Sequence, residues 1–411
     1  MRVLIVTQYF WPESFRINDL AACLKRRGHD VTVLTGLPNY PHGKLFAGYG
    51  YFSRRERYEN VDVVRVPLLP RGKSKGLRLL ANFVSFAVSA SLLGPWLCRK
   101  AVDVIFVFEP SPITVALPAI VMKRLRRAPI LFWVQDLWPE TLAATKAVRS
   151  RRLLQLVDRF VRYVYRRCDR VLVQSQGFVE HVRAQGVASE NVRYFPNSAE
   201  SFYRPLARDE AKAEDAELPR GFRIVYAGNI GISQSIDTIL DAAERTRDRP
   251  EIQWILLGEG RDRARVAEEI GRRRLERTVH LPGPRPVESM PRYFAAADAL
   301  LATLRREPVF ALTIPSKVQS YLACGRPILG SLDGEGARVV VEAEAGLVGA
   351  AEDGAALAAN AGKLCDMPTR DRDRLGENGR RYFERHFDST GLVDRLENWM
   401  AEVTEGRRCA A

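Results

Sequence analysis

A lysine near the start of a predicted helix is the first side chain whose position indicates chemistry. Ser316 and Gln319 fit the S-x-x-Q capping box, which predicts a helix that begins here and ends at Gly325. Lys317 would then lie in the first helical turn, where a cation opposes the helix dipole unless an anion is bound beside it. The position favours a diphosphate ligand for Lys317, and an exposed lysine on a well-capped helix is the alternative.

A turn rich in small residues is a second candidate for phosphate binding. Residues 225–231 (VYAGNIG) predict a strand that runs into a turn, followed by a helix from about Ser235. Gly228 and Gly231 would let the backbone approach a phosphate, and the free N–H groups of the helix start would bind it. An ordinary strand-to-helix turn would have the same sequence, so both interpretations stay open.

A carboxylate in the first half could act on a second substrate. Asp136 follows an apolar strand predicted at residues 130–134, and Pro139 comes shortly after it. At the carboxyl end of a parallel strand, this carboxylate could position a hydroxyl group or stabilise charge at a reacting centre. A turn or helix cap before Pro139 is the alternative. Arg16 and Asn18, at the start of the first predicted helix, would face the same region.

An alternation of short apolar strands and helix-period segments must position these residues. Strands are predicted at residues 3–7, 31–35, 61–66, 104–108, 130–134 and 171–174, and again at 223–227, 253–257, 278–281, 299–303 and 327–329. This pattern predicts an α/β protein with parallel, doubly wound sheets, which bind ligands at the carboxyl ends of their strands. We assign residues 1–200 to a first domain, 201–220 to a polar linker, 221–380 to a second domain and 381–411 to a helical tail. The ligand site is expected in the cleft between the two domains.

The composition excludes several classes of protein. With 411 residues, 46% hydrophobic and 27% charged, the chain is typical of a soluble protein of two or three domains, which excludes collagen, coiled coils, disorder and a polytopic membrane protein. Six cysteines include no CxxC pair and five histidines show no metal-ligand spacing, so neither a disulfide scaffold nor a metal site is expected. No dinucleotide-binding GxGxxG follows the first strand. The N-terminus does not resemble a signal peptide, so we expect a cytoplasmic protein.

Positive charge is concentrated in the first half. Residues 1–200 carry 31 Lys and Arg against 15 Asp and Glu, or +16, whereas residues 201–411 carry 32 against 34, or −2. Anionic partners of the first half would be a nucleic-acid backbone, an acidic membrane surface or a phosphorylated acceptor. Residues 79–98 contain no charge and are flanked by basic side chains, among them Lys73 and Lys75. We expect this segment to be a buried or surface-docked helix rather than one that dips into or spans a membrane.

The order of motifs along the chain resembles the family-four retaining GT-B glycosyltransferases of the bacterial O-antigen, capsule and colanic-acid type. The segments that carry the resemblance are YFWPE (9–13), RRGHDVTVLT (26–35), DLWPE (136–140), GNIGISQ (228–234), LLGEGRDR (256–263), FAAADALL (294–301), PSKVQSYLACGRPI (315–328) and RRYFERHF (380–387). They extend over essentially the whole chain. The resemblance implies a GT-B fold, in which two doubly wound Rossmann-like domains face a central cleft and C-terminal helices return to the N-terminal domain.

The resemblance also implies a reaction. Such an enzyme would transfer a sugar, here an N-acetylated or deoxy hexosamine, from a UDP-sugar to an undecaprenyl-diphosphate-linked saccharide, with retention and without a metal ion or other cofactor. The leaving diphosphate would accept the acceptor's proton, and the basic first domain and the apolar segment would contact the anionic inner membrane. The donor would be bound by Gly228, Asn229, Gly231, Gln234, Arg285, Ser316, Lys317, Gln319 and Ser320, the acceptor by Glu13, Arg16, Asn18 and Trp138, and Asp136 and Lys317 would be catalytic.

The sequence departs from the family pattern at several positions. Ser14 and Phe15 replace two glycines, Gln135 a histidine, Asn229 and Gln234 an arginine and a lysine, and Leu312 and Ser320 a pair of glutamates. Loss of the two cations would remove charge-assisted contacts worth about 1.5–3 kcal/mol each, so Lys317 and helix N-termini would have to compensate. The same changes accompany PSKVQSYLACGRP in a subgroup that includes N-acetylfucosamine transferases, and we interpret them as a mark of that subgroup.

Three alternatives stay open at this point. A UDP-sugar 2-epimerase would share the architecture. A non-catalytic GT-B subunit that binds lipid or a partner enzyme would account for the missing glutamates and the neutral phosphate loop. Nucleic-acid binding would fit the basic half, but the chain contains no recognisable nucleic-acid module, so no nucleic-acid partner is expected.

Overall fold

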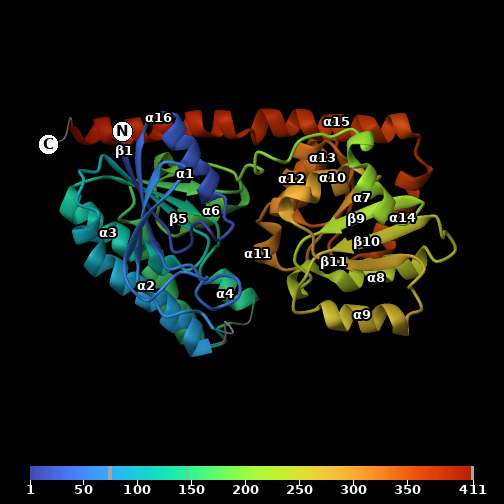
Figure 1. Ribbon diagram of the computed structural model, residues 1–411, viewed down its shortest axis with the longest axis horizontal. Helices are drawn as coiled ribbons and strands as arrows, with labels where there is room; N and C mark the ends of the chain where they lie inside the picture. The colour runs from blue at the N-terminus through green and yellow to red at the C-terminus, as the bar shows by residue number, and fades with distance from the viewer. Residues whose placement is uncertain (73–75, 146, 409–411) are drawn as a thin grey trace. The chain divides into compact units, whose positions relative to one another are not determined.

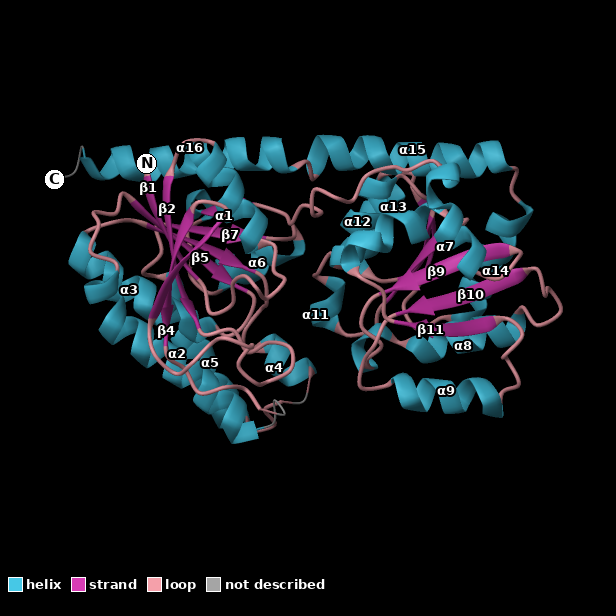
Figure 2. Cartoon of the chain, viewed as in Figure 1, coloured by secondary structure: helices cyan, strands magenta, loops and turns pink. Residues whose placement is uncertain are grey.

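Two separate β-sheets organise the chain, each inside a unit of its own (Figure 1). The structure is a computed structural model that describes residues 1–72, 76–145 and 147–408. Unit 1 comprises Met1–Pro196 together with the chain from Thr390 onward, and unit 2 comprises Asn197–Ser389. In each unit helices pack around the sheet, so that each unit is a Rossmann-like α/β domain of the kind that the alternation predicts (Figure 2).

The described part of unit 1 contains an eight-stranded sheet in the order β3-β4-β2-β1-β5-β6-β7-β8. The strands are β1 (Arg2–Val6), β2 (Asp30–Gly36), β3 (Arg54–Tyr58), β4 (Val61–Val66), β5 (Val104–Glu109), β6 (Ile130–Val134), β7 (Arg170–Val173) and β8 (Val192–Tyr194). Every neighbouring pair is parallel except β3 and β4. All residues of β5 and β6 are buried, because helices cover both faces of a parallel sheet.

Seven α-helices accompany this sheet in the described residues of unit 1. They are α1 (Ile17–Arg26), α2 (Gly76–Leu97), α3 (Ala116–Arg126), α4 (Glu140–Ala144), α5 (Arg151–Tyr165), α6 (Gly177–Ala184) and α16 (Ser389–Arg408). Helix α1 is the first predicted helix, and its apolar face, including Leu20 and Leu24, lies in the core.

The described part of unit 2 contains a fully parallel six-stranded sheet in the order β11-β10-β9-β12-β13-β14. The strands are β9 (Phe222–Ala227), β10 (Ile252–Leu257), β11 (Val279–Gly283), β12 (Ala299–Thr303), β13 (Ile328–Ser331) and β14 (Gly346–Gly349). The helices are α7 (Lys212–Glu217), α8 (Ile236–Arg245), α9 (Arg263–Arg272), α10 (Met290–Ala295), α11 (Pro308–Ala311), α12 (Ser316–Cys324), α13 (Gly334–Glu342), α14 (Gly354–Asp366) and α15 (Thr369–His386).

Each sheet reverses its strand order beside its first strand. In unit 1 the chain places β2 and β4 on one side of β1 and then returns to place β5 on the other side. In unit 2 it places β10 and β11 beside β9 and then returns with β12. Doubly wound sheets bind ligands outside the carboxyl ends of the strands at such a switch point. The loops after β1, β5, β9 and β12 are therefore the places to search for a site.

Every predicted strand overlaps an observed one, but three edge or near-edge strands escaped prediction. Strand β3 has the sequence RRERY, whose charged side chains give no apolar signal, and it pairs antiparallel with β4. Strands β8 and β14 have only three and four residues. Short or charged edge strands are common because they discourage pairing with other chains, and this property hides them from apolar patterns.

The unit boundaries differ from those expected. The chain divides after Pro196, and residues 201–220, which were expected to form a linker, include α7 and place Ala211 and Leu218 in the core of unit 2. The tail expected at 381–411 also divides. Helix α15 places Phe383 and Phe387 in the core of unit 2, whereas only α16 returns to unit 1.

Helix α16 explains why the end of the chain belongs with its beginning. Its apolar side chains, including Leu396 and Met400, join the same core as Val3 and Ile5 of β1. Phe195, at the end of the first pass through unit 1, also lies in this core and contacts Trp399. The return of C-terminal helices to the N-terminal domain is thus confirmed for α16 alone.

Helix α2 has one docked face and one exposed apolar face. It packs on α3 and buries Asn82, Phe86 and Gly94. The buried Asn82 accepts a hydrogen bond from Nε2 of Gln8 at the end of β1 (2.7 Å) and donates one to the Leu69 carbonyl (2.6 Å). By length and composition α2 could cross a membrane. The segment expected at residues 79–98 is therefore docked through one side only.

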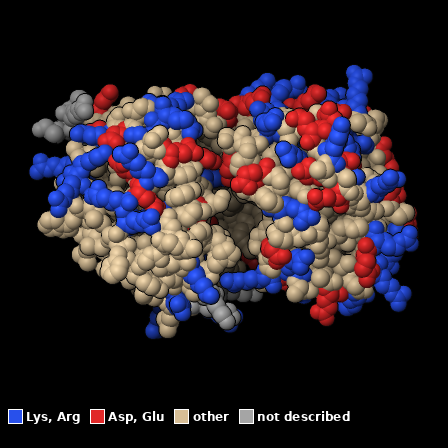
Figure 3. Space-filling view, viewed as in Figure 1, with Lys and Arg blue, Asp and Glu red and all other residues tan. Residues whose placement is uncertain are grey.

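The exposed face of α2 is a continuous apolar stripe. Its members recur every three or four residues, from Leu77 (84% exposed) to Trp96 (69% exposed), and the intervening ones are Leu80, Val84, Val88 and Leu92. Figure 3 shows few charged side chains over this part of unit 1. The expected basic residues Lys73 and Lys75 lie outside the described residues.

Candidate active site

The turn after β9 is shaped by glycines on two neighbouring loops. Gly228 has a φ of 141°, and its N–H donates to the Leu257 carbonyl of β10 (2.9 Å). A Cβ on Gly258 would lie 1.8 Å from the Gly228 carbonyl oxygen, and one on Gly260 would lie 2.0 Å from that of Ile230. The two loops can approach this closely only because both positions lack a side chain. The roles of Gly258 and Gly260 were missed, although the LGEG segment is a visible signal.

Lys317 lies against this turn, as the sequence predicts. It is the second residue of α12, and its Nζ is buried 3.6 Å from the ring centre of Tyr226, close to Gly228. No described residue forms a hydrogen bond with that Nζ. Burial lowers the pKa of Lys317 to about 7. The structure thus brings Gly228 and Lys317 together and adds Tyr226, which sequence reasoning did not single out.

Two neutral amides complete the turn. Nδ2 of Asn229 donates to Oε1 of Gln234 (3.2 Å), and both side chains pass over Gly231, where a Cβ would lie 2.7 Å from that Nδ2. The hydroxyl of Tyr226 donates to the Asn229 carbonyl (2.6 Å). Asn229, Gly231 and Gln234 are therefore neighbours, as predicted, and their amides leave the turn without a charge of its own.

The start of α12 differs from the predicted capping box. Pro315 is the N-cap and Ser316 is the first helical residue, with no side-chain cap hydrogen bond, so the capping box is wrong. Gln319 is fully buried and its amide has no partner among the described residues, while Oγ of Ser320 donates to the Ser316 carbonyl (3.3 Å). The helix ends at Gly325 in a left-handed conformation, as predicted. Donor contacts by Ser316, Gln319 and Ser320 stay predictions.

Arg285 is held by its own unit. Its guanidinium donates to the Tyr293 hydroxyl (2.8 Å) and to Oε2 of Glu217 (3.1 Å), and also to the Pro282 carbonyl (3.2 Å). These bonds tie the loop after β11 to α7 and α10. Contact between Arg285 and a nucleotide base stays a prediction, and its side-chain donors already have partners within unit 2.

Two carboxyl groups lie at the carboxyl ends of β5 and β6, next to the switch point of unit 1. Asp136 follows β6, and Glu109 ends the neighbouring β5, where it pairs in register with Val134. Glu109 is fully buried, and burial together with the charge of Asp136 raises its pKa well above the ordinary value; the backbone N–H groups of Asp136 and Gln135 oppose this shift. Burial also raises the pKa of Asp136, to about 7. Because two adjacent carboxylates resist joint ionisation and Glu109 is the more deeply buried of the two, burial favours the protonated form of Glu109.

Sequence reasoning missed Glu109, although it follows directly after the predicted strand 104–108. Other polar groups surround the pair at the ends of β6 and β7. Nε2 of Gln174 donates to the Gln135 carbonyl (3.4 Å), and Nε2 of His181 lies 3.2 Å from a carboxylate oxygen of Glu140. Trp138 is buried, and its Nε1 has no hydrogen-bond partner among the described residues. An acceptor role for Trp138 stays a prediction.

Glu13 and Asn18 hold the loop after β1 in place. Oε1 of Glu13 accepts hydrogen bonds from the backbone N–H groups of Asn39 (2.8 Å) and Tyr40 (2.7 Å). The side chain of Asn18 accepts from the Trp11 N–H (3.0 Å) and donates to the Glu13 carbonyl (2.8 Å). Both side chains are buried. In this structure both side chains position the loop, and their acceptor contacts stay predictions.

Arg16 immediately precedes α1 and is half-buried. Its position beside the loop after β1 agrees with the predicted region. Its contact with an acceptor stays a prediction.

Comparisons with known proteins assign both units. Residues 14–198 match the Glycosyl transferase 4-like domain, and residues 221–367 match Glycosyl transferases group 1. The putative colanic acid biosynthesis glycosyl transferase WcaI of Escherichia coli strain K12 is 26% identical over 79% of this chain and 82% of its own. The chain belongs to the family-four GT-B glycosyltransferases of polysaccharide biosynthesis.

Solved structures share the fold of this glycosyltransferase. HepE from Anabaena in complex with UDP and glucose matches with a TM-score of 0.70 at 17% identity, over 98% of this chain and 99% of that one. Sucrose-phosphate synthase from Thermosynechococcus elongatus matches with a TM-score of 0.71 at 18% identity, over the same shares. Likeness at these identities establishes the GT-B fold.

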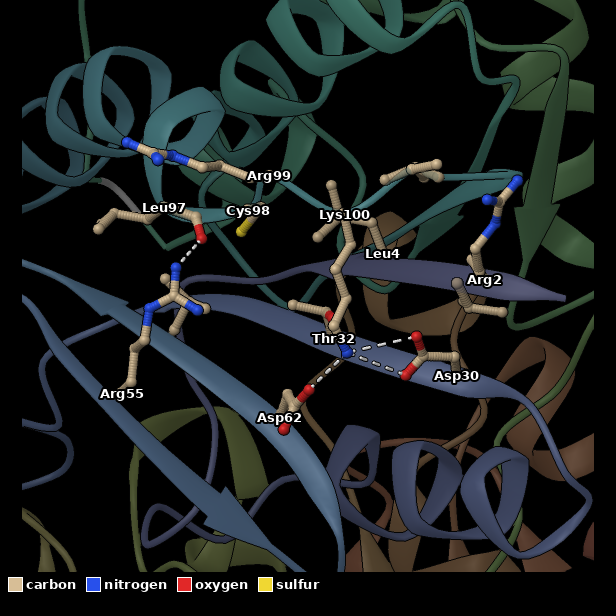
Figure 4. Close-up of a pocket in the computed structure, with 14 residues that line it drawn as sticks. Arg2, Leu4, Asp30, Thr32, Arg55, Asp62, Leu97, Cys98, Arg99 and Lys100 are labelled. Carbon is tan, nitrogen blue, oxygen red and sulfur yellow. Dashed lines mark hydrogen bonds and ion pairs between the residues drawn. The ribbon is translucent and has the colours of Figure 1, made fainter.

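A cavity in unit 1 of the glycosyltransferase lies away from the switch point. It has a volume of about 90 Å³ and lies at the amino ends of β1 and β2 (Figure 4). Lys100 crosses it and contacts Asp62 (2.9 Å) and Asp30 (3.3 Å). Ligand pockets usually measure about 300–1,000 Å³. This cavity is therefore too small for a sugar nucleotide, and its lysine is already neutralised.

Proposed function

We propose that this glycosyltransferase transfers a sugar from a UDP-sugar to a saccharide carried by a lipid diphosphate, with retention and without a metal ion or other cofactor. The observation that carries the proposal is the buried ammonium of Lys317 against the Gly228 turn. A buried cation without a hydrogen-bond partner is costly unless an anion pairs with it. HepE, whose fold this chain shares, is described in complex with UDP and glucose, which supports UDP as the nucleotide.

Lys317 supplies the charge that a leaving diphosphate requires. Asn229 and Gln234 are neutral, so the turn after β9 offers hydrogen bonds and Lys317 offers the positive charge. Electrostatic stabilisation of charge that develops in the transition state is commonly the largest catalytic contribution. The diphosphate that leaves accepts the proton of the attacking hydroxyl on the same face of the sugar.

Asp136 acts on the acceptor side. Its carboxylate positions the attacking hydroxyl or stabilises positive charge on the sugar, for which it must be ionised. An undecaprenyl-diphosphate-linked saccharide is the proposed acceptor, and an N-acetylated or deoxy hexosamine is the proposed sugar. The likeness to a putative colanic acid biosynthesis enzyme supports a lipid-linked acceptor of this class.

Nucleotide binding tests the proposal first. Thermal unfolding of the wild type is measured with UDP, GDP, ADP, NAD and buffer alone. UDP at 100 times its dissociation constant would add about 2.7 kcal/mol to the stability of the folded state. A selective shift with UDP, followed by sugar transfer to a lipid-linked acceptor, supports the proposal. No shift with any nucleotide contradicts it, and UDP binding without transfer to a broad panel of acceptors favours a non-catalytic subunit.

We also propose that the enzyme is cytoplasmic and binds the inner membrane peripherally through α2. The stripe from Leu77 to Trp96 offers exposed apolar area at helical spacing. Basic side chains lie at its end: Nη2 of Arg126 donates to the Cys98 carbonyl (3.1 Å), and Arg99 donates to the Trp96 carbonyl (3.0 Å). Apolar insertion combined with attraction to anionic lipid is the usual basis of interfacial binding.

Vesicle co-sedimentation tests this attachment. The wild type is expected to bind phosphatidylserine-containing vesicles more strongly than purely zwitterionic ones. Val88→Glu in the stripe should reduce binding several-fold, whereas Val341→Glu, at an exposed position of α13 in unit 2, should not. Equal binding by the wild type and the Val88 variant would remove α2 from the proposal.

A further inference from the structure

The position of Lys317 requires an explanation from its surroundings. A lysine in the first turn of a helix is unfavourably placed with respect to the dipole, and a buried ammonium loses its hydration. Its Nζ nevertheless lies at the centre of the Tyr226 ring face, at 3.6 Å. An aromatic face attracts a cation most strongly when both are desolvated. Tyr226 is therefore the group that compensates for the unfavourable position.

Tyr226 is itself fixed from two sides. It is fully buried next to the end of β9, and its hydroxyl donates to the Asn229 carbonyl (2.6 Å). Tyr321 of α12 is also fully buried, and its hydroxyl accepts from the Ala227 N–H (3.2 Å) and donates to the Leu301 carbonyl (3.2 Å). The ring under Lys317 is thus held by the same turn that would receive a phosphate.

No carboxylate of the described residues contributes to the electrostatics of Lys317. Burial lowers the pKa of Lys317 to about 7, and burial, followed by the neighbouring Tyr321, raises the pKa of Tyr226. From the turn, Asn229 and Gln234 present neutral amides. A diphosphate would therefore be the first full negative charge to approach the amine.

We propose that Tyr226 is a positioning residue, which holds the Lys317 amine in the absence of donor, and that the diphosphate draws this amine off the ring with uptake of one proton. No covalent bond changes: the neutral fraction of the amine takes a proton from solvent and becomes the ammonium that pairs with the diphosphate. The inference rests on the proposed function for the identity of the ligand. Beyond that function, the inference assigns Tyr226 as the residue that holds the lysine and links donor binding to the uptake of a proton.

Proton uptake provides the first test and needs no change at Tyr226. UDP is titrated into the wild type at pH 8.5 by calorimetry in two buffers of different ionisation enthalpy. Because most Lys317 amines are neutral at this pH, uptake of about one proton per UDP is expected. The phosphate of UDP titrates near pH 6 and does not contribute. Lys317→Met should bind UDP more weakly and without uptake.

A double-mutant cycle provides the second test. Tyr226→Leu should weaken UDP binding roughly tenfold because the lysine loses its aromatic support, whereas Tyr226→Phe keeps the ring and should bind nearly as the wild type does. In the Lys317→Met background, Tyr226→Leu should have little further effect. Thermal unfolding without ligand checks that each variant is folded.

The outcomes separate the two proposals. If the wild type does not bind UDP at all, the proposed function fails. If UDP binds but without proton uptake, or if the Tyr226→Leu and Lys317→Met losses simply add, the function stands and the role of Tyr226 is overturned. If Tyr226→Leu does not fold, the buffer comparison of wild type and Lys317→Met still decides whether UDP binding is linked to a proton on Lys317, and Tyr226→Met, which also lacks an aromatic face, replaces Tyr226→Leu in the cycle.

Discussion

The two units use the same architecture to bury ionisable groups of opposite sign. Among the described residues, unit 2 places a lysine with no hydrogen-bond partner on its amine beside the turn after β9, and unit 1 places two carboxyl groups at the ends of β5 and β6. The turn after β9 and the end of β5 lie where the strand order reverses, and β6 is the next strand beyond β5. The comparison teaches that a doubly wound sheet fixes where a site lies, whereas one or two side chains fix its charge.

The surroundings of the two sites differ as well. The turn in unit 2 is made of glycines, which allow two loops to approach closely, and of neutral amides. The loop after β1 in unit 1 is held by buried polar side chains, Glu13 and Asn18, whose polar atoms bind backbone groups. The turn in unit 2 thus brings backbone and neutral side chains together at the proposed donor site, whereas the buried polar side chains of unit 1 hold a loop in place.

The largest expected effect is the loss of the cation in unit 2. Lys317→Ala should lower sugar transfer about 10²–10³-fold while the fold stays intact, because the leaving diphosphate loses its positive partner. Steady-state kinetics with a UDP-sugar and a lipid-linked acceptor measure the effect. Lys363→Ala, at an exposed position of α14, is the matched control. Unchanged turnover in the Lys317 variant would remove this residue from the mechanism.

The two carboxyl groups of unit 1 should not be equivalent. Asp136→Asn should lower transfer about 100-fold, whereas Glu109→Gln should change it less than about threefold at pH 7, because burial raises the pKa of Glu109 well above its ordinary value and favours its neutral form. Activity of the wild type should rise with pH through about 7 as Asp136 ionises. Rate profiles between pH 5.5 and 8.5 measure both effects. Equal losses in the two variants would show that Glu109 acts as an anion.

The close approach of two loops in unit 2 should not tolerate a methyl group. Gly258→Ala places a Cβ 1.8 Å from the Gly228 carbonyl oxygen at a positive φ, so the turn must shift. We expect a loss of about 2–3 kcal/mol in stability and weaker UDP binding. Denaturant unfolding and UDP titration measure the two effects. Gly391→Ala, whose Cβ would meet no atom within 4 Å, should change neither.

The smallest expected effect is a change in how stability depends on pH. In the folded protein the pKa of Glu109 lies well above its ordinary value of 4.5, so ionisation favours the unfolded chain and stability falls as the pH rises above about 5. Glu109→Gln should remove the part of this fall between pH 5 and pH 8 that comes from Glu109. Urea unfolding at both values measures it, with the exposed Glu190→Gln as control. A slope unchanged by Glu109→Gln would mean that this carboxyl group is not buried in solution.

The features of the site that could be predicted are those that depend on residues close together in the sequence. Lys317 in a first helical turn, Gly325 at the helix end, and the neighbours Asn229 and Gln234 follow from residues a few positions apart, and the structure contains all of them. The prediction of a capping box was also based on neighbouring residues, and it was wrong. Gln319 is buried in the interior, and tertiary packing rather than the local sequence pattern decides the direction of its side chain.

The sequence by itself determined the parallel strands at the centre of both sheets, their order along the chain, and the lysine and aspartate that follow them. Periodicity and turn residues carry this information, since they act over short stretches of chain. Only the tertiary structure decided that Tyr226 supports Lys317 from 91 positions away, that Glu109 is buried beside Asp136, that Glu13 holds a loop, and that α16 completes unit 1. Burial and contact between distant segments set these properties, because the same side chain changes its role with the groups that surround it.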